Sequence, residues 1–333
     1  MAIYVSDTSQ VVFMYESGTY ATTSGTSGNW LGLVTEHSPT DNENVMTVRY
    51  TGTNSRNAGI LINGAKDYEG TITYHPQDFR MFTFALGSVL DAGSPSPYTH
   101  AITESNSADG NAFTSGPSHP FISFTVKDSK KGAADGFHQV RTYNGCSVDS
   151  LSLTLSQGEA VVCGLGYKAQ SLTLGSKTTD IVNILDKDTS RPYIWSDFKF
   201  HLESGTVMNE VTDLSLTITN NLEGRHYDNG SKVINSLIPT NRDYELSLTL
   251  DANSTWGKTL YEQYYQGGSE FNCMIEGVIS AGSEQGFIML SGCKISSFES
   301  PSPSEGINEY SLTAIPTSCN VNVDDLKLKY GAW

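Results

Sequence analysis

One short stretch of the sequence occurs twice, and this repeat limits what the chain can fold into. Lys66 opens "KDYEGTITYHP" and Arg242 opens "RDYELSLTLDA", so in both places Asp-Tyr-Glu leads into alternating polar and apolar residues. Tyr68 and Tyr244 are 176 positions apart. Such alternation is typical of an antiparallel strand with one face on a core and the other in water. The repeat therefore predicts two equivalent strands.

Three further landmarks follow both copies in the same order. Each strand precedes a helical pattern that ends at a glycine, over roughly 77–87 and 255–266. Next come two stretches of 17 residues that run from Phe to Gly-Phe, namely Phe121 to Phe137 and Phe271 to Phe287. An Asn/Ser-Gly-Cys then ends at Cys146 and at Cys293. Four landmarks in one order indicate a duplication.

The remaining patterns are those of strands, including "DSLSLTLS", "DLSLTIT" and "SDFKFHLE". We therefore predict a mainly β protein with two tandem antiparallel β-sandwich or barrel domains, each with one packed α-helix. The predicted first domain, with an N-terminal arm, is 1–172, and the second is 192–318. A linker is predicted at 173–191 and a C-terminal extension at 319–333.

The two copies differ in the lengths of their connections. Gly87 and Phe121 are 34 positions apart, whereas Gly267 and Phe271 are 4 apart. The extra residues of the first copy are rich in Ser, Pro, Gly and Asn, which predicts an exposed insertion loop near 88–120. The second copy is longer at 225–241, where the sequence predicts an extended hairpin tip. Its shorter counterpart is 52–65.

The composition excludes several classes of protein. The net charge is −16 and the acidic residues are spread through both halves, so the surface should not adhere to nucleic acid. No apolar run is long enough for a membrane helix and no signal-peptide pattern opens the chain, so we expect a soluble cytoplasmic product without membrane insertion. The five cysteines form no Cys-x-x-Cys pair, which favours buried free thiols.

No motif predicts catalysis. "CGLGYKA" at 163–169 superficially matches a dinucleotide fingerprint, but no helical pattern follows it, so we interpret it as a strand. The seven histidines are scattered, which argues against a metal site. Two pairs of carboxylates lie two residues apart, and we interpret them as structural; they are Asp67 with Glu69 and Asp243 with Glu245. We predict no catalytic residue, no metal and no cofactor.

Several stretches together resemble the tail tube proteins of tailed bacterial and archaeal viruses. They include "FMYESGTYATTSGTSGNWLGLV", "SRNAG", "DYEGTITYHPQDFRMFTFALGS", "NGCSVDSLSLTL" and "RPYIWSDFKFHL". The resemblance implies a structural virion protein of the viral tail, made in the host cytoplasm, whose rings stack into a tube that conducts the genome. A ring commonly has six single-domain subunits, so a duplicated chain would close a pseudo-hexameric ring as a trimer.

The resemblance also implies partners and surfaces. The expected partners are other copies of the chain, the tape measure protein, the tail terminator and distal tail proteins, while double-stranded viral DNA passes without specific binding. The residues expected to line the lumen are Asp67, Glu69, Thr71, Thr73, Asp243, Glu245, Ser247 and Thr249. The residues expected to contact an adjacent ring are Arg56, Arg225, His226, Tyr227 and Asp228.

Alternatives remain open at this point. The polar residues of the two repeated strands could instead face solvent outside, or lie at subunit contacts with Lys66 and Arg242 as ion-pair partners. A virion decoration or receptor-binding β-sandwich protein would also show tandem β-domains and an acidic composition. A carbohydrate-active β-sandwich enzyme would need a cleft with converging carboxylates, which the sequence cannot reveal.

Overall fold

The computed structural model describes the chain in segments separated by short gaps. The described residues are 9–16, 20–22, 27–50, 59–93, 97–105, 122–131, 138–175, 183–185, 187–203, 205–252, 255–280, 284–302 and 307–325. The fold is 64% strand and 8% helix, with large antiparallel sheets. The mainly β fold class predicted from the sequence is therefore confirmed.

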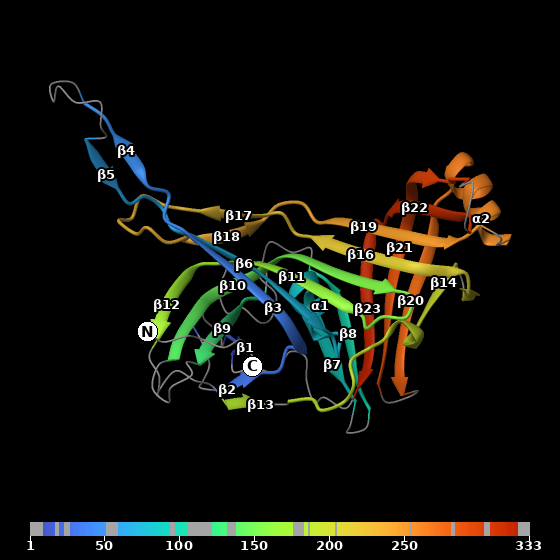
Figure 1. Cartoon of the computed structure of the whole chain (residues 1–333), viewed down its shortest axis with the longest axis horizontal. Coiled ribbons are helices and arrows are strands. Elements are labelled where there is room, and N and C mark those ends of the chain that lie inside the picture. Colours follow the sequence, from blue (N-terminus) through green and yellow to red (C-terminus); the bar gives the residue numbers. More distant parts are fainter. Residues whose placement is uncertain are drawn as a thin grey trace.

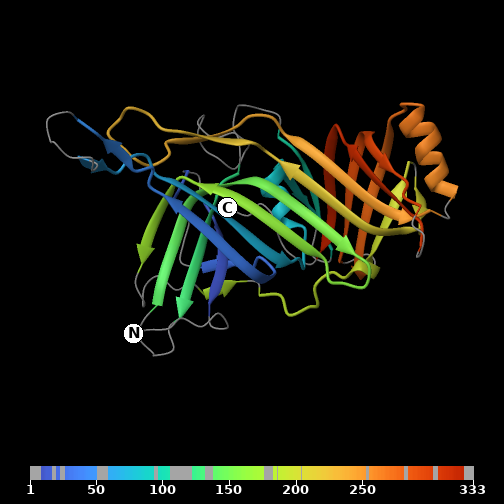
Figure 2. The ribbon, with the colours of Figure 1, turned by 45° about the horizontal axis from the view of Figure 1, so that its top comes forward.

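An eight-stranded antiparallel sheet, here called the long sheet, runs through the whole molecule (Figures 1 and 2). Its order is β3 (Leu33–Asn42), β6 (Asp67–His75), β11 (Val162–Ala169), β10 (His138–Ser156), β16 (Val211–Thr219), β19 (Asp243–Asp251), β22 (Glu309–Ile315) and β21 (Glu284–Glu299). The pairing of β10 with β16 joins the first half of the sequence to the second in one continuous sheet.

Two outer sheets pack on the apolar face of the long sheet. The first contains β12 (Ser171–Gly175), β10, β9 (Phe124–Lys131), β1 (Gln10–Tyr15), β2 (Ser27–Asn29) and β13 (Asn183–Leu185). The second contains β7 (Gly87–Ala92), β8 (Tyr98–Glu104), β23 (Ser318–Asp325), β21, β20 (Phe271–Ser280), β14 (Phe198–Leu202) and β15 (Thr206–Met208).

The long strands β10 and β21 pass from an outer sheet into the long sheet, and a glycine lies where each one changes sheet. Gly145 has φ +64° and Gly292 has φ +59°. This left-handed region carries no steric penalty for glycine, whereas a Cβ would clash there. The glycine of each Asn/Ser-Gly-Cys landmark is therefore explained by the bend between the two sheets.

The remaining elements are two hairpins and short helices. The hairpins are β4 (Met46–Val48) with β5 (Ile60–Ile62), and β17 (Leu222–Arg225) with β18 (Ser236–Pro239). The helices are α1 (Arg80–Leu86), the 3-10 turn η2 (Trp195–Asp197), and α2 (Thr255–Thr259), which continues as the π-helix η3 (Leu260–Gln266). Helices thus occur where both helical patterns predict them.

Strand pairings recur with the same register in the two halves of the sequence. Phe124 lies opposite Cys146 on β9 and β10, and Phe271 lies opposite Cys293 on β20 and β21, each 147 positions later. The ladder of β3 with β6 recurs in the same way as the ladder of β16 with β19, including the position of the bulge. The boundaries of two separate domains stay a prediction.

One predicted landmark is misaligned by three residues. The sequence match equates Phe121 with Phe271 and Phe137 with Phe287, and both residues of the first copy lie outside the described residues. The ladders make Phe124 the counterpart of Phe271 and Val140 the counterpart of Phe287. Both strands of each ladder are related to their counterparts by one offset of 147 positions, whereas the matched phenylalanines are 150 positions apart, so the match of sequence letters gives the wrong register.

Two further predictions about the connections are wrong. The predicted insertion loop near 88–120 contains most of β7 and all of β8, and β8 pairs with β23 at the edge of the second outer sheet. The predicted C-terminal extension at 319–333 contains most of β23, which pairs with β21. The residues Tyr98–Glu104 alternate between buried and more exposed side chains as in a strand, but the Ser-, Pro- and Gly-rich segments on both sides favour the prediction of a loop.

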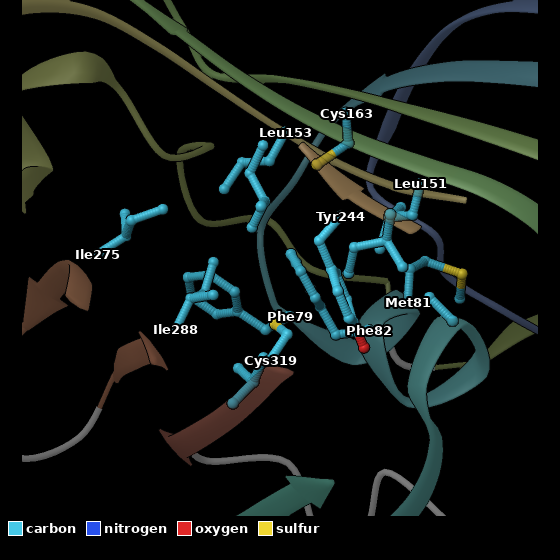
Figure 3. Packing of buried hydrophobic residues seen from close by; sticks show 14 of the residues in the cluster. Phe79, Met81, Phe82, Leu151, Leu153, Cys163, Tyr244, Ile275, Ile288 and Cys319 are labelled. Atoms are coloured by element: carbon cyan, nitrogen blue, oxygen red, sulfur yellow. The ribbon is translucent and has the colours of Figure 1, made fainter. Parts of the chain in front are cut away.

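Helix α1 lies between the two halves of the sequence: all seven of its residues are buried, and its last carbonyls accept hydrogen bonds from Asn220 and Arg242 of the second half. Phe79, which precedes it, packs its ring against the paired glycines Gly277 and Gly286 of the second outer sheet, where an added Cβ at Gly286 would lie 2.3 Å from the ring. Figure 3 shows Phe79 beside Tyr244, Ile288 and other core side chains of the second half. The glycine pair makes room for an aromatic ring from the other half.

We expect Phe79→Ala to lower the free energy of unfolding by about 3–5 kcal/mol, because it removes a buried ring that its surroundings cannot refill. Urea denaturation of the purified chain measures this change. Leu90→Ala, at a side chain that is 70% exposed, is the control, and we expect it to change stability by about 0.5 kcal/mol or less. Equal effects of the two substitutions would contradict this packing.

A buried histidine adds a polar contact between β8 and its neighbours. His100 is fully buried, with Nδ1 2.7 Å from Asp91 Oδ1 on β7 and Nε2 3.1 Å from Asp325 Oδ1 on β23. Burial by itself would lower the pKa of His100, but the hydrogen bonds to Asp325 and Asp91 outweigh it and raise the pKa to about 9. The imidazolium thus bridges two carboxylates at neutral pH.

This bridge predicts a pH dependence of stability. Because the folded-state pKa lies above the ordinary value of 6.5, the stabilisation is complete below about pH 6.5 and is lost as the pH rises through about 9. We expect the unfolding free energy to fall across this window, and to fall less steeply in His100→Gln. Urea titrations of both proteins at several pH values measure the difference. Identical slopes would show that His100 is not a charged bridge.

Candidate functional site

The outward face of the long sheet, here called the polar face, carries the side chains predicted to line a lumen. On β6 and β19 the buried residues alternate with the polar ones. Glu69, Thr71, Asp243 and Glu245 are exposed, and the other four are half-buried, namely Asp67, Thr73, Ser247 and Thr249. The structure brings all eight onto one face of one sheet, on strands separated by β11, β10 and β16.

Small hydroxyl side chains cover the centre of the polar face. They come from β10 and β16, where Ser150, Ser152 and Thr154 alternate with buried leucines and lie opposite Thr219, Thr217 and Ser215. Gly164 and Gly166 of β11 lie beside two of these serines, and a Cβ on either glycine would come within 2.7 Å of a serine Oγ. The centre of the face is therefore smooth and uncharged.

Carboxylates outnumber cations around this centre. The acidic residues on the same face of the sheet are Glu36, Asp67, Glu69, Asp213, Asp243, Glu245, Asp251, Glu299 and Glu309, and the basic ones are Lys168 and Lys294. The Lys168 Nζ donates to the Leu222 carbonyl at 2.7 Å and lies 3.5 Å from Asp149 Oδ1, so one of these two cations already has partners. The face as a whole is acidic.

Lys66 and Arg242 have partners other than the carboxylates of the repeated strands. Lys66 Nζ donates to Glu43 Oε1 at 2.5 Å. Arg242 donates to Asn220 Oδ1 at 2.9 Å and to the Leu86 carbonyl at 3.1 Å, at the end of helix α1. The Arg242 side chain therefore binds the first half of the chain.

An asparagine turn at the base of each hairpin recurs in both halves. Asn44 and Asn221 have positive φ values of 34° and 48°, which asparagine tolerates better than most residues. Each donates through Nδ2, at 2.6 Å, to the aspartate that starts the next strand, Asp67 and Asp243 respectively. The first aspartate of each pair of carboxylates thus has a structural role that the sequence alone did not reveal.

The hairpin β17–β18 extends from the second half and lies across the first half of the same chain (Figure 1). The Lys66 amide donates to the Lys232 carbonyl at 2.7 Å, and His226 Nε2 lies 3.0 Å from Asp67 Oδ1. A recess of about 720 Å³ remains between the hairpin and the ends of β3, β6 and β11. This hairpin is anchored by contacts on both sides of its tip.

The hairpin β4–β5 projects from one end of the long axis of the molecule (Figure 1). It carries a set of exposed apolar side chains, namely Val45, Met46, Val48, Tyr50, Ile60, Leu61 and Ile62. Exposed apolar patches of this kind mark interaction surfaces in soluble proteins. Sequence reasoning located the hairpin but missed this patch, although the apolar letters of "NVMTVRY" and "GILING" in a loop position were a usable signal.

The residues predicted to contact an adjacent ring have different environments. Arg56 lies outside the described residues. Arg225 forms an exposed ion pair with Glu223 at 2.6 Å, and His226 contacts Asp67 within the chain. Tyr227 is 55% exposed and Asp228 is also exposed. Tyr227 and Asp228 are therefore open to a partner, while His226 is already in contact.

The cysteines and the other potential metal ligands of the described residues have ordinary structural environments. No group of three or more His, Cys, Asp or Glu side chains among them could hold a metal ion. All five cysteines are buried and free, as the sequence predicts, and burial raises the pKa of Cys163 to about 12. The "CGLGYKA" stretch forms β11, in agreement with its interpretation as a strand. The helices among the described residues are too short or too polar to cross a bilayer.

Comparison with known proteins identifies the family to which this chain belongs. The model of the family described as "Phage tail tube protein" matches residues 7–284, which is most of the chain. The chain belongs to the phage tail tube protein family. Among solved structures it is similar to the SPP1 tail tube, with 13% identity and a TM-score of 0.32 over 42% of this chain and 82% of that chain. No curated protein matches it.

The phage tail tube family is structural. This tail tube protein is a structural component of the virion tail, and the family self-assembles into a tube with other tail proteins. The resemblance inferred from the sequence is confirmed, and with it the structural function.

Proposed function

We propose that three copies of this tail tube protein close a pseudo-hexameric ring and that these rings stack into a tube that conducts the viral genome. The pairing of β10 with β16 carries this proposal, because it joins the two copies of the repeat through their inner strands in one sheet. Each chain would then supply two of the six positions that single-domain subunits commonly fill. The division into domains, which is the basis of this count, is part of the proposal.

We propose further that the polar face lines the lumen of this tube. The opposite face of the long sheet packs on the outer sheets and α1, so the polar face is the one left for water. This face carries mainly hydroxyl and carboxylate side chains and few Lys or Arg residues, so it would bind the phosphates of a passing duplex only weakly. The residues proposed to line the lumen are Asp67, Glu69, Thr71, Thr73, Asp243, Glu245, Ser247 and Thr249. Asp67 would lie at the rim, because His226 and Asn44 contact it.

The hairpin tips are proposed to contact the adjacent ring. Tyr227 and Asp228 are exposed at the tip of the hairpin β17–β18, and Arg56 is the residue proposed for the same role between β4 and β5 in the sequence. The predicted difference in hairpin length is wrong, because Arg225 pairs with Ser236 and Val48 pairs with Ile60 over nearly equal spacings. Arg225 and His226 would support the tip through Glu223 and Asp67. The tape measure protein inside the tube, and the tail terminator and distal tail proteins at its ends, are the further proposed partners. Manufacture in the host cytoplasm belongs to the same proposal.

We expect the purified chain to form rings or tubes in cryo-electron microscopy, with threefold symmetry and pseudo-sixfold repetition of the β-domains. A reconstruction would also show whether the tips with Tyr227 and Asp228 touch the next ring. Six chains in one ring, or discrete oligomers that never stack at high concentration, would contradict the proposal. Discrete oligomers that bind a capsid or a host surface would instead support a decoration or receptor-binding protein.

We expect Glu69→Lys combined with Glu245→Lys to leave the tubes intact and to slow genome ejection, because cations in the lumen would bind the phosphates of the moving duplex. Both side chains are exposed, so the variant should fold. The matched control replaces both residues with Gln, which removes charge without adding cations, and should eject at nearly the normal rate. Release of DNA from virions, followed with a fluorescent dye, measures the rates. Equal rates for the Lys variant and the unaltered virus, with normal tails, would exclude the lumen assignment.

A further inference from the structure

The two hairpins occupy equivalent positions, but their apolar side chains have opposite environments. Leu237 lies opposite Gly224 on β17–β18, and Leu61 lies opposite Thr47 on β4–β5. These positions are 176 and 177 apart, the spacings that also relate β6 to β19 and β3 to β16. Leu237 is 3% exposed, whereas Leu61 is 65% exposed.

A second equivalent pair shows the same contrast. Leu222 at the start of β17 is 3% exposed, and its counterpart Val45 is 55% exposed. The backbone around Leu222 is bound by the first half of the chain: its amide donates to Asp149 Oδ1 at 2.8 Å and its carbonyl accepts from Lys168 Nζ at 2.7 Å. Leu222 is thus covered because a neighbouring copy of the repeat lies beside it.

The same junction uses the end of helix α1 as a second anchor. Asn220 is 1% exposed and donates through Nδ2 to the carbonyls of Ala85 and Val148, both at 3.0 Å. Arg242 donates to the Leu86 carbonyl. The equivalent helix, α2 with η3, has an uncovered side, where Tyr261 and Tyr265 are 38% and 40% exposed.

The long sheet also has two edges that are equivalent to its central junction. Inside the chain, β10 pairs with β16. The counterparts of these strands are β21 and β3. Among the described residues, β3 is paired only with β6, and residues 295–299 of β21 are paired only with β22. These edges lie toward opposite ends of the molecule (Figure 1), so a second copy can join them head to tail.

We propose that the contact between neighbouring chains in the ring repeats the junction inside each chain. In this contact β3 of one chain pairs with the end of β21 of the next, and the hairpin β4–β5 lies across the second half of that next chain. The occupant of the exposed hairpin face is therefore a second copy of this chain. The inference rests on the proposed ring, and it adds which surfaces meet and in which register.

The internal junction gives the register of the contact. Ser150 lies opposite Thr219 at the junction of β10 and β16. The repeat spacings convert this pair into Ser297 on β21 and Asn42 on β3, which are both exposed and on the polar face. By the same spacings, Ile315 is the counterpart of Lys168, which contacts Leu222. Ile315 is 52% exposed. An exposed isoleucine thus lies where Val45 of the next chain would arrive.

Cysteine cross-linking in assembled tubes tests this register. Asn42→Cys with Ser297→Cys should give disulfides between chains, because paired Cα atoms on neighbouring strands lie within the range of a disulfide. The control is Ser38→Cys with Ser297→Cys, displaced along β3 by four residues or about 14 Å, which should not cross-link. The native cysteines are buried and free, so they react slowly with the added oxidant.

The gel pattern separates this inference from the proposed ring. Covalent trimers as the largest species support both, while a ladder that continues to hexamers supports the contact and contradicts the trimer. Tubes without cross-links, or with cross-links only in the displaced control, overturn the contact and leave the tube function standing. Unaltered chains that never assemble overturn both. Where the cysteine variants fail to assemble, hydrogen exchange on unaltered tubes decides, because amides in 36–42 and 297–299 must become protected.

The hairpin part of the contact has its own test. Leu61→Asp should fold as a monomer, since the side chain is exposed, but should lose ring formation in sedimentation velocity and electron microscopy. Leu90→Asp places the same charge at a leucine of equal size on β7 that is 70% exposed, and should assemble normally. Normal rings from Leu61→Asp overturn the assignment of the hairpin to a second copy. Normal tubes with lost infectivity would assign it to another virion protein.

Discussion

The antiparallel pairing of β10 with β16 is the interaction on which the rest of the structure depends. Seven consecutive residue pairs, from Ser150 with Thr219 to Ser156 with Asp213, join the halves of the sequence without a break in the sheet. Because side chains alternate along a strand, this register puts the leucines of both strands on the core side and the hydroxyls on the other side. A register shift of one residue would place the leucines of one strand on the same face as the hydroxyls of the other. The continuous polar face and the continuous core are thus consequences of one ladder.

Helix α1 explains why the two halves are more than neighbours in a sheet. Its seven residues are buried, and Phe79 in front of it occupies the space that Gly277 and Gly286 leave open in the other half. The strands β7 and β8 then extend the outer sheet of the second half, where Glu104 accepts from the Tyr244 hydroxyl at 2.6 Å. The residues inserted into the first copy of the repeat therefore reinforce the junction inside the chain. In the second copy Gly267 and Phe271 are only four positions apart, so it has no equivalent strands there.

The sequence predicts the repeated elements well because their signals are local. The alternation after Asp67 and Asp243, the two helices and the strand character of "CGLGYKA" all follow from periodicity over a few residues. What it misses depends on contacts between distant residues. The strand at Tyr98–Glu104 forms because β23 offers it an edge, and the buried Asn220 becomes intelligible only beside Ala85 and Val148. The eight candidate lumen residues share one face of the sheet, as the alternation predicts. The contacts of Asp67 with Asn44 and His226 join residues far apart in the sequence, so no linear pattern could predict them.

In the proposed ring, duplication within one chain would permit alternate junctions to differ, which six identical subunits could not do. Lys168 beside the Leu222 carbonyl has Ile315 as its counterpart, and the buried Leu222 has the exposed Val45. The junction inside the chain forms during folding, when the two halves are linked and each has a high effective concentration for the other. This junction also includes the strands β7 and β8 and the hydrogen bonds of Asn220. The junction between chains must form from exposed surfaces that also keep the monomer soluble. A small apolar hairpin and a short free edge on an acidic molecule meet both requirements, since the net charge of −16 disfavours nonspecific association while local complementarity favours the correct one. In the proposed ring, the divergence between the two copies would follow from the different stages at which the two junctions form, one during folding and the other during assembly.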